Sequence, residues 1–346
     1  QNKDGLTVDA DHVVAITNGG GIRAAIKPGD VTKKDINTVL PFGNTVAVIY
    51  VTGAELLEAL EASTYSLPVG GFPQVAGINF TLSTAVAYDA NAETYPASTY
   101  YGPKSINRVV INSINGKEFK ANEVYAVVTN NFCAAGGDTY YAFKAASAQF
   151  DTGIPLDEAV MEYVTTELKG VIGAQYAAPQ GRILLNPFKD VKVSSWFGKY
   201  VIDLYNDGII NGTSATTYTP DAKLSWAAAL KLLLVSHGDL KSEDATGADW
   251  SKNAIAKAAE LGLVAADLDG AKAISRLEFC QVAAKLNKLA ESKTESKFTD
   301  CTDGYVMALV DAKVINGMTE TTFEPSATLT RAQIAKIIYQ LNLIEK

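Results

Sequence analysis

The residues best suited to chemistry stand together in one short run, Asn18-Gly19-Gly20-Gly21-Ile22-Arg23, directly after an apolar, β-branched stretch over residues 13–17. This order predicts a strand that ends in a loop whose backbone can approach a ligand closely. We expect the glycine N–H groups to face an anion, and the Arg23 guanidinium to supply a planar, permanently charged partner for phosphate or carboxylate. A tight strand-to-helix turn with a solvated arginine is the alternative.

Two later loops each carry a phenylalanine beside small or polar residues. Pro41-Phe42-Gly43-Asn44 lies between a predicted helix over residues 33–40 and a predicted strand over residues 45–52. The run from Asn130 to Asp138, which contains Phe132, follows another predicted strand. Loops lie at the surface, so an aromatic ring there needs a partner. One such ring is well explained as a local plug, but two of them beside an anion-binding loop favour a stacking ligand.

These motifs resemble those of a known family. Four segments, NGGGIR at residues 18–23, LPFGN at 40–44, GGFPQ at 70–74 and NNFCAAGGD at 130–138, are similar in order and rough spacing to the C-terminal domain of 5'-nucleotidases. The resemblance covers about residues 10 to 186 and implies an α/β (α+β) fold with a mixed sheet. It also implies that this domain holds the nucleotide, whereas a separate N-terminal domain, with two divalent metal ions, cuts it.

The resemblance implies a role for six residues: Arg23 at the phosphate or a neighbouring group with Asn18 beside it, Phe42 and Phe132 around the base, Asn44 in a hydrogen bond with the base, and Asp138 at the ribose hydroxyls. The chemistry of these side chains fits those roles. A base stacked on aromatic rings gains ~1–3 kcal/mol with little demand on its identity. A carboxylate accepts hydrogen bonds from a diol, and a guanidinium pairs with a phosphate.

Metal-dependent hydrolysis is not expected from this chain alone. In the family two metal ions activate water and clamp the transferring phosphoryl group, and the resemblance implies that their ligands lie on the N-terminal domain. This sequence has His12 and His237, far apart, and three scattered cysteines, without the spacing of a metal site. It starts at Gln1 without a signal segment or the family's preceding arginine-bearing helix. We therefore expect a fragment that begins inside the substrate domain, with no catalytic or metal-binding residue.

Composition indicates a folded chain of two or three domains. The 346 residues are 47% hydrophobic and 20% charged, and no apolar run is long enough to span a membrane. A net charge of −8 argues against a nucleic-acid polymer as the partner, because such a partner would favour a basic face. Three cysteines cannot all pair with one another, so each is expected to be a free, buried thiol.

The second half has a helical pattern that repeats. Three pairs of segments recur at one shared offset: Asn211-Gly212 and Asn316-Gly317, Tyr218-Thr219-Pro220 and Phe323-Glu324-Pro325, and Leu224-Ser225 and Leu329-Thr330. A middle copy around Ile274-Ser275-Arg276 completes three helix-turn-helix units over residues 187–240, 241–291 and 292–346. The Asn-Gly pair of the third unit is predicted to cap the C-terminus of a helix.

These units resemble S-layer homology repeats over about residues 187 to 343. The similar features are the opening Phe188-x-Asp190 and Phe298-x-Asp300, an aromatic residue on the first helix (Trp196, Trp250, Tyr305) and a T-R-A-E-like tetrapeptide. The resemblance implies an all-α, pseudo-threefold module whose grooves bind pyruvylated secondary cell-wall polysaccharide, with Arg276 and Arg331 on the acidic sugar and Trp196 as a further glycan contact. The first turn of a helix, with its N–H donors and positive dipole end, suits an anion.

The first repeat departs from this pattern, because Trp226 takes the position of the arginine. An indole cannot pair with a carboxylate, so one of the three grooves is in question, although the ring could stack on a sugar. A solvated charge at a helix start remains the alternative for Arg276 and Arg331. Packing between repeats remains the alternative for Trp196 and Trp226, and is favoured for Trp250.

Several other residues are expected to be structural. Glu55, Glu58 and Glu61 would form the solvated face of a helix. The tyrosine-rich stretch over residues 95–101 would be a packed surface loop rather than part of a nucleotide cleft. Local caps and turns are expected at Asp35, at the Asn115-Gly116 hairpin turn, and in two capping boxes, Ser275 with Glu278 and Thr330 with Gln333.

The sequence therefore predicts an α/β nucleotide-binding domain followed by an all-α, wall-attaching module. Together the resemblances imply the C-terminal part of a secreted, wall-anchored 5'-nucleotidase-type phosphohydrolase, which binds a nucleoside monophosphate at one end and wall polysaccharide at the other. The competing hypothesis is a non-enzymatic surface or S-layer protein that uses the nucleotidase-like domain as a spacer or binding module. Both hypotheses place the chain outside the cell, at the wall or S-layer.

Overall fold

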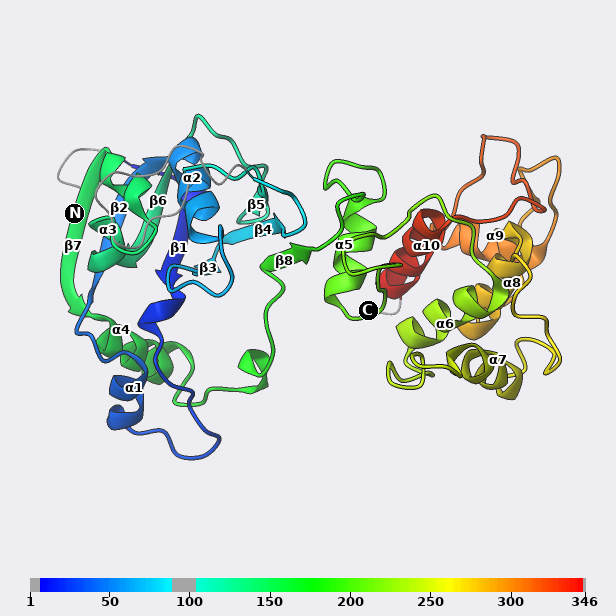
Figure 1. Ribbon diagram of the computed structural model, residues 1–346, viewed down its shortest axis with the longest axis horizontal. Helices are drawn as coiled ribbons and strands as arrows, with labels where there is room; N and C mark the ends of the chain where they lie inside the picture. Colours follow the sequence, from blue (N-terminus) through cyan, green and yellow to red (C-terminus); the bar gives the residue numbers. More distant parts are fainter. Residues whose placement is uncertain (1–6, 89–103, 345–346) are drawn as a thin grey trace. The chain divides into compact units, whose positions relative to one another are not determined.

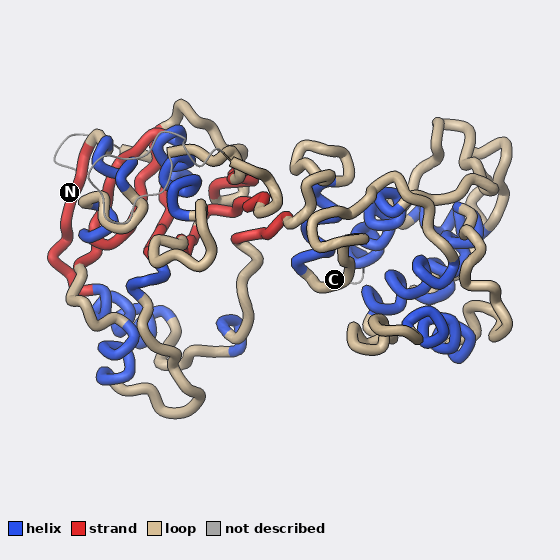
Figure 2. The backbone as a smooth tube through the Cα atoms, viewed as in Figure 1, coloured by secondary structure: helices blue, strands red, loops and turns tan. Residues whose placement is uncertain are grey.

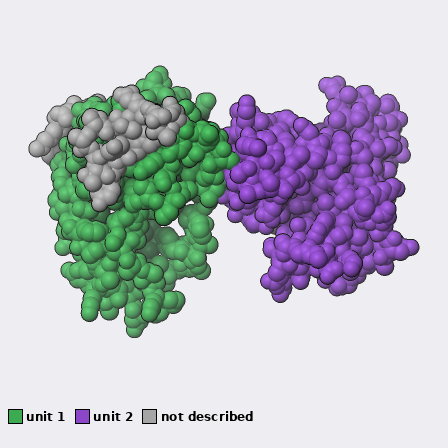
Figure 3. All heavy atoms as spheres, in the orientation of Figure 1, with its two compact units in different colours: residues 1–185 green, residues 186–346 purple. Residues whose placement is uncertain are grey.

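The computed structural model describes residues 7–88 and 104–344, so the tyrosine-rich stretch 95–101 lies outside the described residues. The chain divides into two compact units, residues 1–185 and 186–346 (Figure 3). Strands gather in the first unit, whereas the second is helical over its described residues (Figure 2). The first unit therefore has the mixed α/β character predicted from its sequence.

The main sheet of the first unit has five strands in the order β3-β1-β6-β2-β7 (Figure 1). Their bounds are Val13–Asn18 for β1, Thr45–Thr52 for β2, Pro73–Ala76 for β3, Val124–Asn130 for β6 and Ala148–Pro155 for β7. β1 and β6 run parallel, and the other neighbouring pairs run antiparallel. The mixed sheet implied by the family resemblance is therefore confirmed.

A smaller sheet has the order β5-β4-β8, with bounds Val109–Ile114, Ile78–Ser83 and Ile183–Asn186. One apolar core joins both sheets through α2 (Gly53–Ser63), whose Leu56 and Leu60 are buried among strand residues of both sheets. Fully burying one such side chain contributes about 1.5–3 kcal/mol. The turn after β5 has positive φ at Asn115 (45°) and Gly116 (77°), so the predicted Asn-Gly turn is confirmed.

Glu61 on α2 does not lie on a solvated face, contrary to the sequence-based expectation. It is buried, and its carboxylate accepts hydrogen bonds from the backbone N–H groups of Ile106, Arg108 and Val109 at 3.0–3.2 Å. Burial raises the pKa of the Glu61 carboxyl, and the backbone N–H donors oppose that rise. The helical period alone could not show that the segment before β5 covers this face of α2.

Short helices complete the first unit: α1 (Lys33–Val39), α3 (Asn131–Ala134), α4 (Leu156–Glu162), and the single-turn segments η1 (Ala10–His12), η2 (Gly19–Gly21), η3 (Tyr141–Ala145), η4 (Tyr163–Glu167) and η5 (Ala174–Tyr176). α1 begins at a capping box in which Thr32 and Asp35 bond reciprocally, so the cap predicted at Asp35 is confirmed. α1 ends at Val39, one residue before the predicted boundary.

The described part of the second unit has six helices: α5 (Gly198–Asn206), α6 (Trp226–His237), α7 (Trp250–Glu260), α8 (Arg276–Leu286), α9 (Gly304–Asp311) and α10 (Arg331–Ile344). They form three successive pairs, one pair in each predicted repeat. α8 begins with the predicted box of Ser275 and Glu278, and α10 with that of Thr330 and Gln333. α6 has only the Ser225 cap, as its sequence indicates.

Backbone hydrogen bonds link the three repeats into a closed ring. In each pair of helices, the first two backbone N–H groups of the second helix donate to two loop carbonyl oxygens of another repeat. At the start of α6, Trp226 donates to Lys272 and Ala227 to Gly270; at the start of α8, Arg276 donates to Ala327 and Leu277 to Pro325. At the start of α10, Arg331 donates to Ala222 and Ala332 to Pro220. The first repeat thus bonds to the second, the second to the third, and the third back to the first. These bonds occupy the helix N–H donors that the sequence had suggested for an anion.

The Asn-Gly pairs do not cap helices, contrary to the prediction. α9 ends at Asp311, and Asn316-Gly317 lies in the loop that follows. A Cβ at Gly317 would lie 2.6 Å from a ring atom of Phe298, and a Cβ at Gly212 would lie 2.7 Å from a ring atom of Phe188. Each glycine therefore allows the loop backbone to lie against the phenylalanine that opens its repeat.

Candidate functional site

The topology of the main sheet brings three of the predicted loops to one edge. β1 and β6 are parallel neighbours, so their carboxyl ends, at Asn18 and Asn130, meet at the same edge. β2 runs antiparallel to β6 and pairs Val46 with Asn130, so the loop before β2, with Phe42 and Asn44, reaches that edge as well. The sheet thus brings together segments that are far apart in the sequence. For example, the backbone N–H of Thr45 donates to the Oδ1 of Asn131 at 3.2 Å, although the two residues are 86 positions apart.

The glycine loop does not offer its first N–H groups to an anion, contrary to expectation. The N–H of Gly19 donates to the carbonyl oxygen of Phe72 at 2.8 Å, and that of Gly20 to the carbonyl oxygen of Gly70 at 2.7 Å. A Cβ on Gly20 would lie 3.0 Å from the same Gly70 oxygen. The glycines are needed here because two backbone segments approach closely. The positive group that this loop presents is the Arg23 side chain.

Arg23 and Phe42 lie side by side. The guanidinium carbon is 5.7 Å from the centre of the Phe42 ring, and the guanidinium donates to the carbonyl oxygen of Gly20 at 3.2 Å. The backbone N–H of Arg23 donates to the carbonyl oxygen of Val39 at 2.9 Å, which ties the glycine loop to the end of α1. Arg23 is exposed, so the other donors of its fork can reach an anion beside the ring.

Two phenylalanine rings are exposed at this edge. Phe42 and Phe132 expose 61% and 42% of their surface. Phe132 lies on α3, and a Cβ at Gly137 would lie 2.6 Å from two atoms of its ring. Gly137 therefore lets the ring rest directly on backbone, which fixes its position. Exposed rings held in this way suit stacking on a planar ligand.

Asp138 lies at the same edge, in a left-handed conformation with φ of 50°, which is uncommon for a residue other than glycine and often marks a functional position. Its Oδ2 accepts a hydrogen bond from the Asn18 Nδ2 at 2.6 Å. The Oδ1 of Asn18 in turn accepts from the Asn130 Nδ2 at 3.0 Å. Asn130 had no predicted role, although its place directly before a helix could have identified it as the N-cap of α3.

Asn44 lines a small cleft at this edge together with Phe42 and Asn130. The backbone carbonyl oxygen of Asn44 accepts a hydrogen bond from the backbone N–H of Leu156 at 2.9 Å, which holds this loop against the start of α4. Cys133, the third residue of α3, is buried, and burial raises the pKa of its thiol to about 12. A thiol with so high a pKa is not a nucleophile at neutral pH. The site is therefore equipped for binding through its rings, amide, carboxylate and guanidinium.

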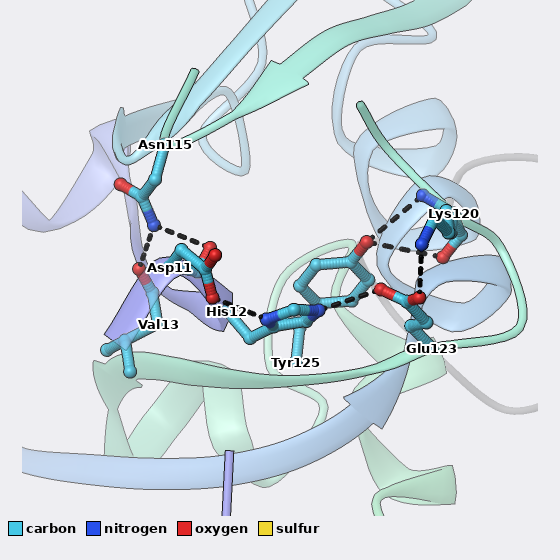
Figure 4. Close-up of polar contacts among 7 residues, drawn as sticks. All are labelled: Asp11, His12, Val13, Asn115, Lys120, Glu123 and Tyr125. Atoms are coloured by element: carbon cyan, nitrogen blue, oxygen red, sulfur yellow. Dashed lines mark hydrogen bonds and ion pairs between the residues drawn. The ribbon is translucent and has the colours of Figure 1, made fainter. Parts of the chain in front are cut away.

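A separate polar cluster lies at the other end of β1 (Figure 4). The two ring nitrogens of His12 lie 2.8 Å from the Asp11 carboxylate and 2.7 Å from the Glu123 carboxylate. The His12 ring also stacks on Tyr125 at 5.2 Å between centroids. Hydrogen bonds to Glu123 and then to Asp11 raise the pKa of His12. The cluster joins the start of β1 to the start of β6, so His12 has a structural role.

The two predicted glycan arginines lie at interfaces between repeats. Arg276 is 7% exposed, donates to the carbonyl oxygen of Asn316 at 2.6 Å, and places its guanidinium carbon 4.6 Å from the centre of the Phe323 ring. Arg331 is half-buried, and its Nε and one terminal nitrogen each donate at 2.8 Å, to the carbonyl oxygens of Tyr218 and Asn211. Neither is a simple solvated charge, which was the alternative.

The third interface has a different composition. The Trp226 side chain is buried, and the backbone N–H of Trp226 donates to the carbonyl oxygen of Lys272. The facing loop of the second repeat, residues 265–270, has neither the Asn-Gly pair nor the aromatic residue that accompany Arg276 and Arg331. This interface therefore lacks the arginine and also the loop residues that contact the arginine at the other two interfaces. Because the Trp226 indole is buried, it does not offer a face for a sugar, unlike the exposed Trp196.

Comparisons with known proteins agree with the motifs in both units. The 5'-nucleotidase C-terminal domain matches residues 3–145, and the S-layer homology domain matches residues 187–229 and 300–335, the first and third predicted repeats. The first unit thus carries a 5'-nucleotidase C-terminal domain. The second carries S-layer homology domains at the first and third predicted repeats. The middle repeat stays a prediction from the sequence, and the ring of backbone hydrogen bonds is consistent with it.

Individual relatives match about half of the chain or less. The trifunctional nucleotide phosphoesterase protein YfkN of Bacillus subtilis is 38% identical over 174 residues, 49% of this chain and 11% of its own length. The cell wall protein Lmo0130 of Listeria monocytogenes is 31% identical over 152 residues, 42% of this chain and 17% of its own. The 5'-nucleotidase precursor structure from Thermus thermophilus is 36% identical, with a TM-score of 0.40, over 50% of this chain and 31% of its own. The chain therefore spans less than a third of each relative.

The described residues contain neither a metal-binding cluster nor a membrane-spanning helix. No three His, Cys, Asp or Glu side chains among them are grouped so as to hold a metal ion. Within the same residues, every helix is too short or too polar to cross a bilayer.

Proposed function

We propose that the first unit binds a nucleoside monophosphate, as the substrate-holding part of a 5'-nucleotidase-type phosphohydrolase. The observation that carries this proposal is the meeting of an exposed arginine, two exposed phenylalanine rings and a carboxylate at one edge of the main sheet. The name of the Bacillus relative, a nucleotide phosphoesterase, supports the same class of substrate. The role of this unit is substrate binding, and no hydrolytic step is assigned to it.

Each group has a defined partner on such a ligand. The base stacks on Phe42 and Phe132, which contributes ~1–3 kcal/mol per ring, and Asn44 lies at the lining of the cleft where it can bond the edge of the base. The Asp138 carboxylate accepts hydrogen bonds from the ribose hydroxyls. The fork of Arg23 pairs with the phosphate.

Titration of the 346-residue chain with AMP tests this proposal by calorimetry. Phe132→Ala should weaken AMP binding roughly 5- to 150-fold, the equivalent of one lost stack. Phe150→Ala is the matched control, because Phe150 on β7 is exposed to 41%, almost the same extent as Phe132 at 42%. Absence of AMP binding at millimolar concentration, or equal losses in the two variants, would contradict the proposed site.

We further propose that the second unit attaches the protein to an anionic cell-wall polysaccharide, which places the chain at the cell wall or S-layer. The support is the S-layer homology match and the two arginines held at repeat interfaces. Arg331 keeps three of its five donors free of the carbonyl oxygens that it bonds. It is also less buried than Arg276, so an acidic sugar can reach these donors more easily. Trp196, exposed beside Phe197, supplies a face for sugar stacking.

Sedimentation with purified cell wall tests the attachment. Arg331→Gln should lose most of the binding, Arg276→Gln should lose less, and Lys241→Gln, at a highly exposed position of the same unit, should bind as the parent chain does. Because both arginines also hold repeats together, thermal unfolding is measured for every variant. Full wall binding by a folded Arg331→Gln, Arg276→Gln double variant would rule out this site.

The second candidate function is that of a non-enzymatic surface protein, in which the first unit serves only as a binding module or as a spacer. The matched domain of a relative named as a cell wall protein keeps this candidate open. An assay of phosphate release from AMP by the whole natural protein distinguishes the two. Release that depends on Phe132 supports the phosphohydrolase, whereas AMP binding without release supports the surface protein.

A further inference from the structure

We propose that Lys231 is a second cationic residue of the wall-binding site at Arg331, so that one acidic group of the polysaccharide is held by an ammonium and a guanidinium from two different repeats. This inference rests on the proposed attachment of the second unit to an anionic wall polysaccharide and deepens it. Lys231 lies on α6 in the first repeat, and Arg331 is the first residue of α10 in the third. Lys231 stands outside the T-R-A-E-like tetrapeptide from which the role of Arg331 was predicted.

The packing of three helices brings Lys231 near Arg331. α6 packs against both α7 and α10, and the hydroxyl of Ser236 on α6 donates to the Asn342 Oδ1 on α10 at 2.8 Å. Arg331 bonds the loop that leads into α6, through the carbonyl oxygen of Tyr218 at 2.8 Å. Burial lowers the pKa of Lys231, and the charge of Arg331 lowers it further. Two cations from different repeats thus lie close together at this interface.

An aromatic ring holds Lys231, and no carboxylate does so within the described residues. The Lys231 Nζ lies 5.2 Å from the centre of the Trp250 ring on α7. Three other lysines on the helices of this unit do form ion pairs: Lys199 with Asp203, Lys252 with Asp249, and Lys257 with Glu260. The positive charge of Lys231 is therefore free to meet a ligand.

This arrangement costs stability when no anion is bound. A half-buried ammonium loses hydration, and a second positive charge nearby repels it. Burial lowers the pKa of Arg331, which the Asp190 carboxylate opposes, but Asp190 already accepts the backbone N–H groups of Tyr218 and Thr219 at 2.8 and 2.7 Å. An acidic group bound between Lys231 and Arg331 would offset the cost. Charged groups that oppose stability in this way are typical of binding sites.

The corresponding positions of the other two repeats differ from Lys231. Counted from the start of the second helix, the same place is taken by Gln281 in the second repeat and by Lys336 in the third. Gln281 donates to the Asp303 Oδ2 at 2.7 Å, so it is a neutral link between α8 and the start of α9. Lys336 is half-buried, as Lys231 is, and this makes it a matched control.

Sedimentation of the 346-residue chain with purified cell wall, over a series of protein concentrations, tests the proposal. Lys231→Met should weaken wall binding about tenfold or more, because a hydrogen bond between two charged groups is lost. Lys231→Arg should bind nearly as the parent chain does, because it keeps the charge, and Lys336→Met should bind as the parent chain does. The deficit of Lys231→Met should shrink as NaCl is raised, because salt screens the attraction that it lacks.

Two further measurements separate a ligand contact from a structural role. The melting temperature of the second unit should stay the same or rise in Lys231→Met, because a repelled cation is removed, whereas loss of a structural lysine would lower it. In an Arg331→Gln background, Lys231→Met should cause a smaller loss of wall binding than it does in the parent chain, because both residues act on one anion.

The possible results lead to distinct conclusions. Unchanged wall binding by Lys231→Met, an equal loss in Lys336→Met, or a lower melting temperature that accompanies the loss would overturn the role of Lys231 while leaving attachment through Arg331 intact. A parent chain that does not sediment with the wall would overturn the proposed attachment itself. Folding of each variant is checked by circular dichroism, and Lys231→Gln gives the comparison if Lys231→Met does not fold.

Discussion

At the scale of single residues, buried polar side chains fix how the loops of the first unit are arranged. Glu61, Asn18 and Asn130 are all buried, and each side chain has protein partners that match its donors and acceptors. A buried polar group costs about 1–3 kcal/mol when its partner is removed. Such groups therefore fix one arrangement of the loops around them, including those that carry the candidate site.

Glu61→Gln should lower the free energy of unfolding of the first unit by about 1–3 kcal/mol. The carboxylate accepts N–H groups on both oxygens, and a glutamine would turn an NH2 toward one of these donors. Urea unfolding followed by circular dichroism measures the change, with Glu118→Gln at an exposed position as the control. Unchanged stability of Glu61→Gln would show that the carboxylate is not needed there.

At the scale of elements, short polar contacts join segments that the sheet leaves adjacent. The His12 cluster holds η1 and the start of β1 against the residues that precede β6 (Figure 4). Lys120 bonds the same Glu123 carboxylate at 2.7 Å, and the hydroxyl of Tyr125 accepts from the backbone N–H of Lys120 at 3.0 Å. The groups that face His12 are thus two carboxylates and one aromatic ring.

This cluster predicts a pH-dependent contribution to stability. The folded chain holds His12 at a raised pKa, so the stabilisation is fully present below the unfolded value near 6.5 and is lost as pH rises through the folded value. The melting temperature of the parent chain should exceed that of His12→Gln by more at pH 5.5 than at pH 9. Glu123→Gln should diminish this pH dependence, and a difference that is equal at both pH values would refute the role of His12.

At the scale of the whole molecule, the two units obtain their order in different ways. The first has a core shared by two sheets and α2. The second closes a ring in which each repeat bonds to another through the start of its second helix. Because every repeat in a ring has two neighbours, loss of one repeat exposes two interfaces. The S-layer homology match covers the first and third repeats, and backbone hydrogen bonds join the predicted middle repeat to both of them.

A chain that ends at residue 291 should therefore lose the cooperative unfolding of the second unit. Without the third repeat, the N–H groups of Arg276 and Leu277 have lost their acceptors on Ala327 and Pro325. The carbonyl oxygens of Ala222 and Pro220 in the first repeat have lost their N–H donors at the start of α10. Differential scanning calorimetry should show a transition for the first unit alone, and AMP affinity should be unchanged. A cooperative transition of the two remaining repeats would contradict the dependence on ring closure.

The sequence by itself determined the features that depend on local conformation and periodicity. The strand over residues 45–52, the Asn115-Gly116 turn and the cap at Asp35 follow from residue types at neighbouring positions. The motifs around Arg23, Phe42, Phe132 and Asp138 were equally visible, because loops with rings and glycines stand out between apolar runs. The repeats were evident for the same reason, since they are patterns along the chain.

Only the tertiary structure decided which groups meet. The backbone N–H groups of Gly19 and Gly20 donate to the loop over residues 70–72, and not to an anion. Glu61 is covered by a segment that includes Ile106, 45 residues further along the chain. Asn18 donates a hydrogen bond to Asp138, which is 120 residues further along the chain. A hydrogen-bond partner so distant is set by strand order and by the crossing of loops, neither of which leaves a periodic signal in the sequence. Local preference therefore predicted where the site residues stand in the chain, and topology assigned their partners.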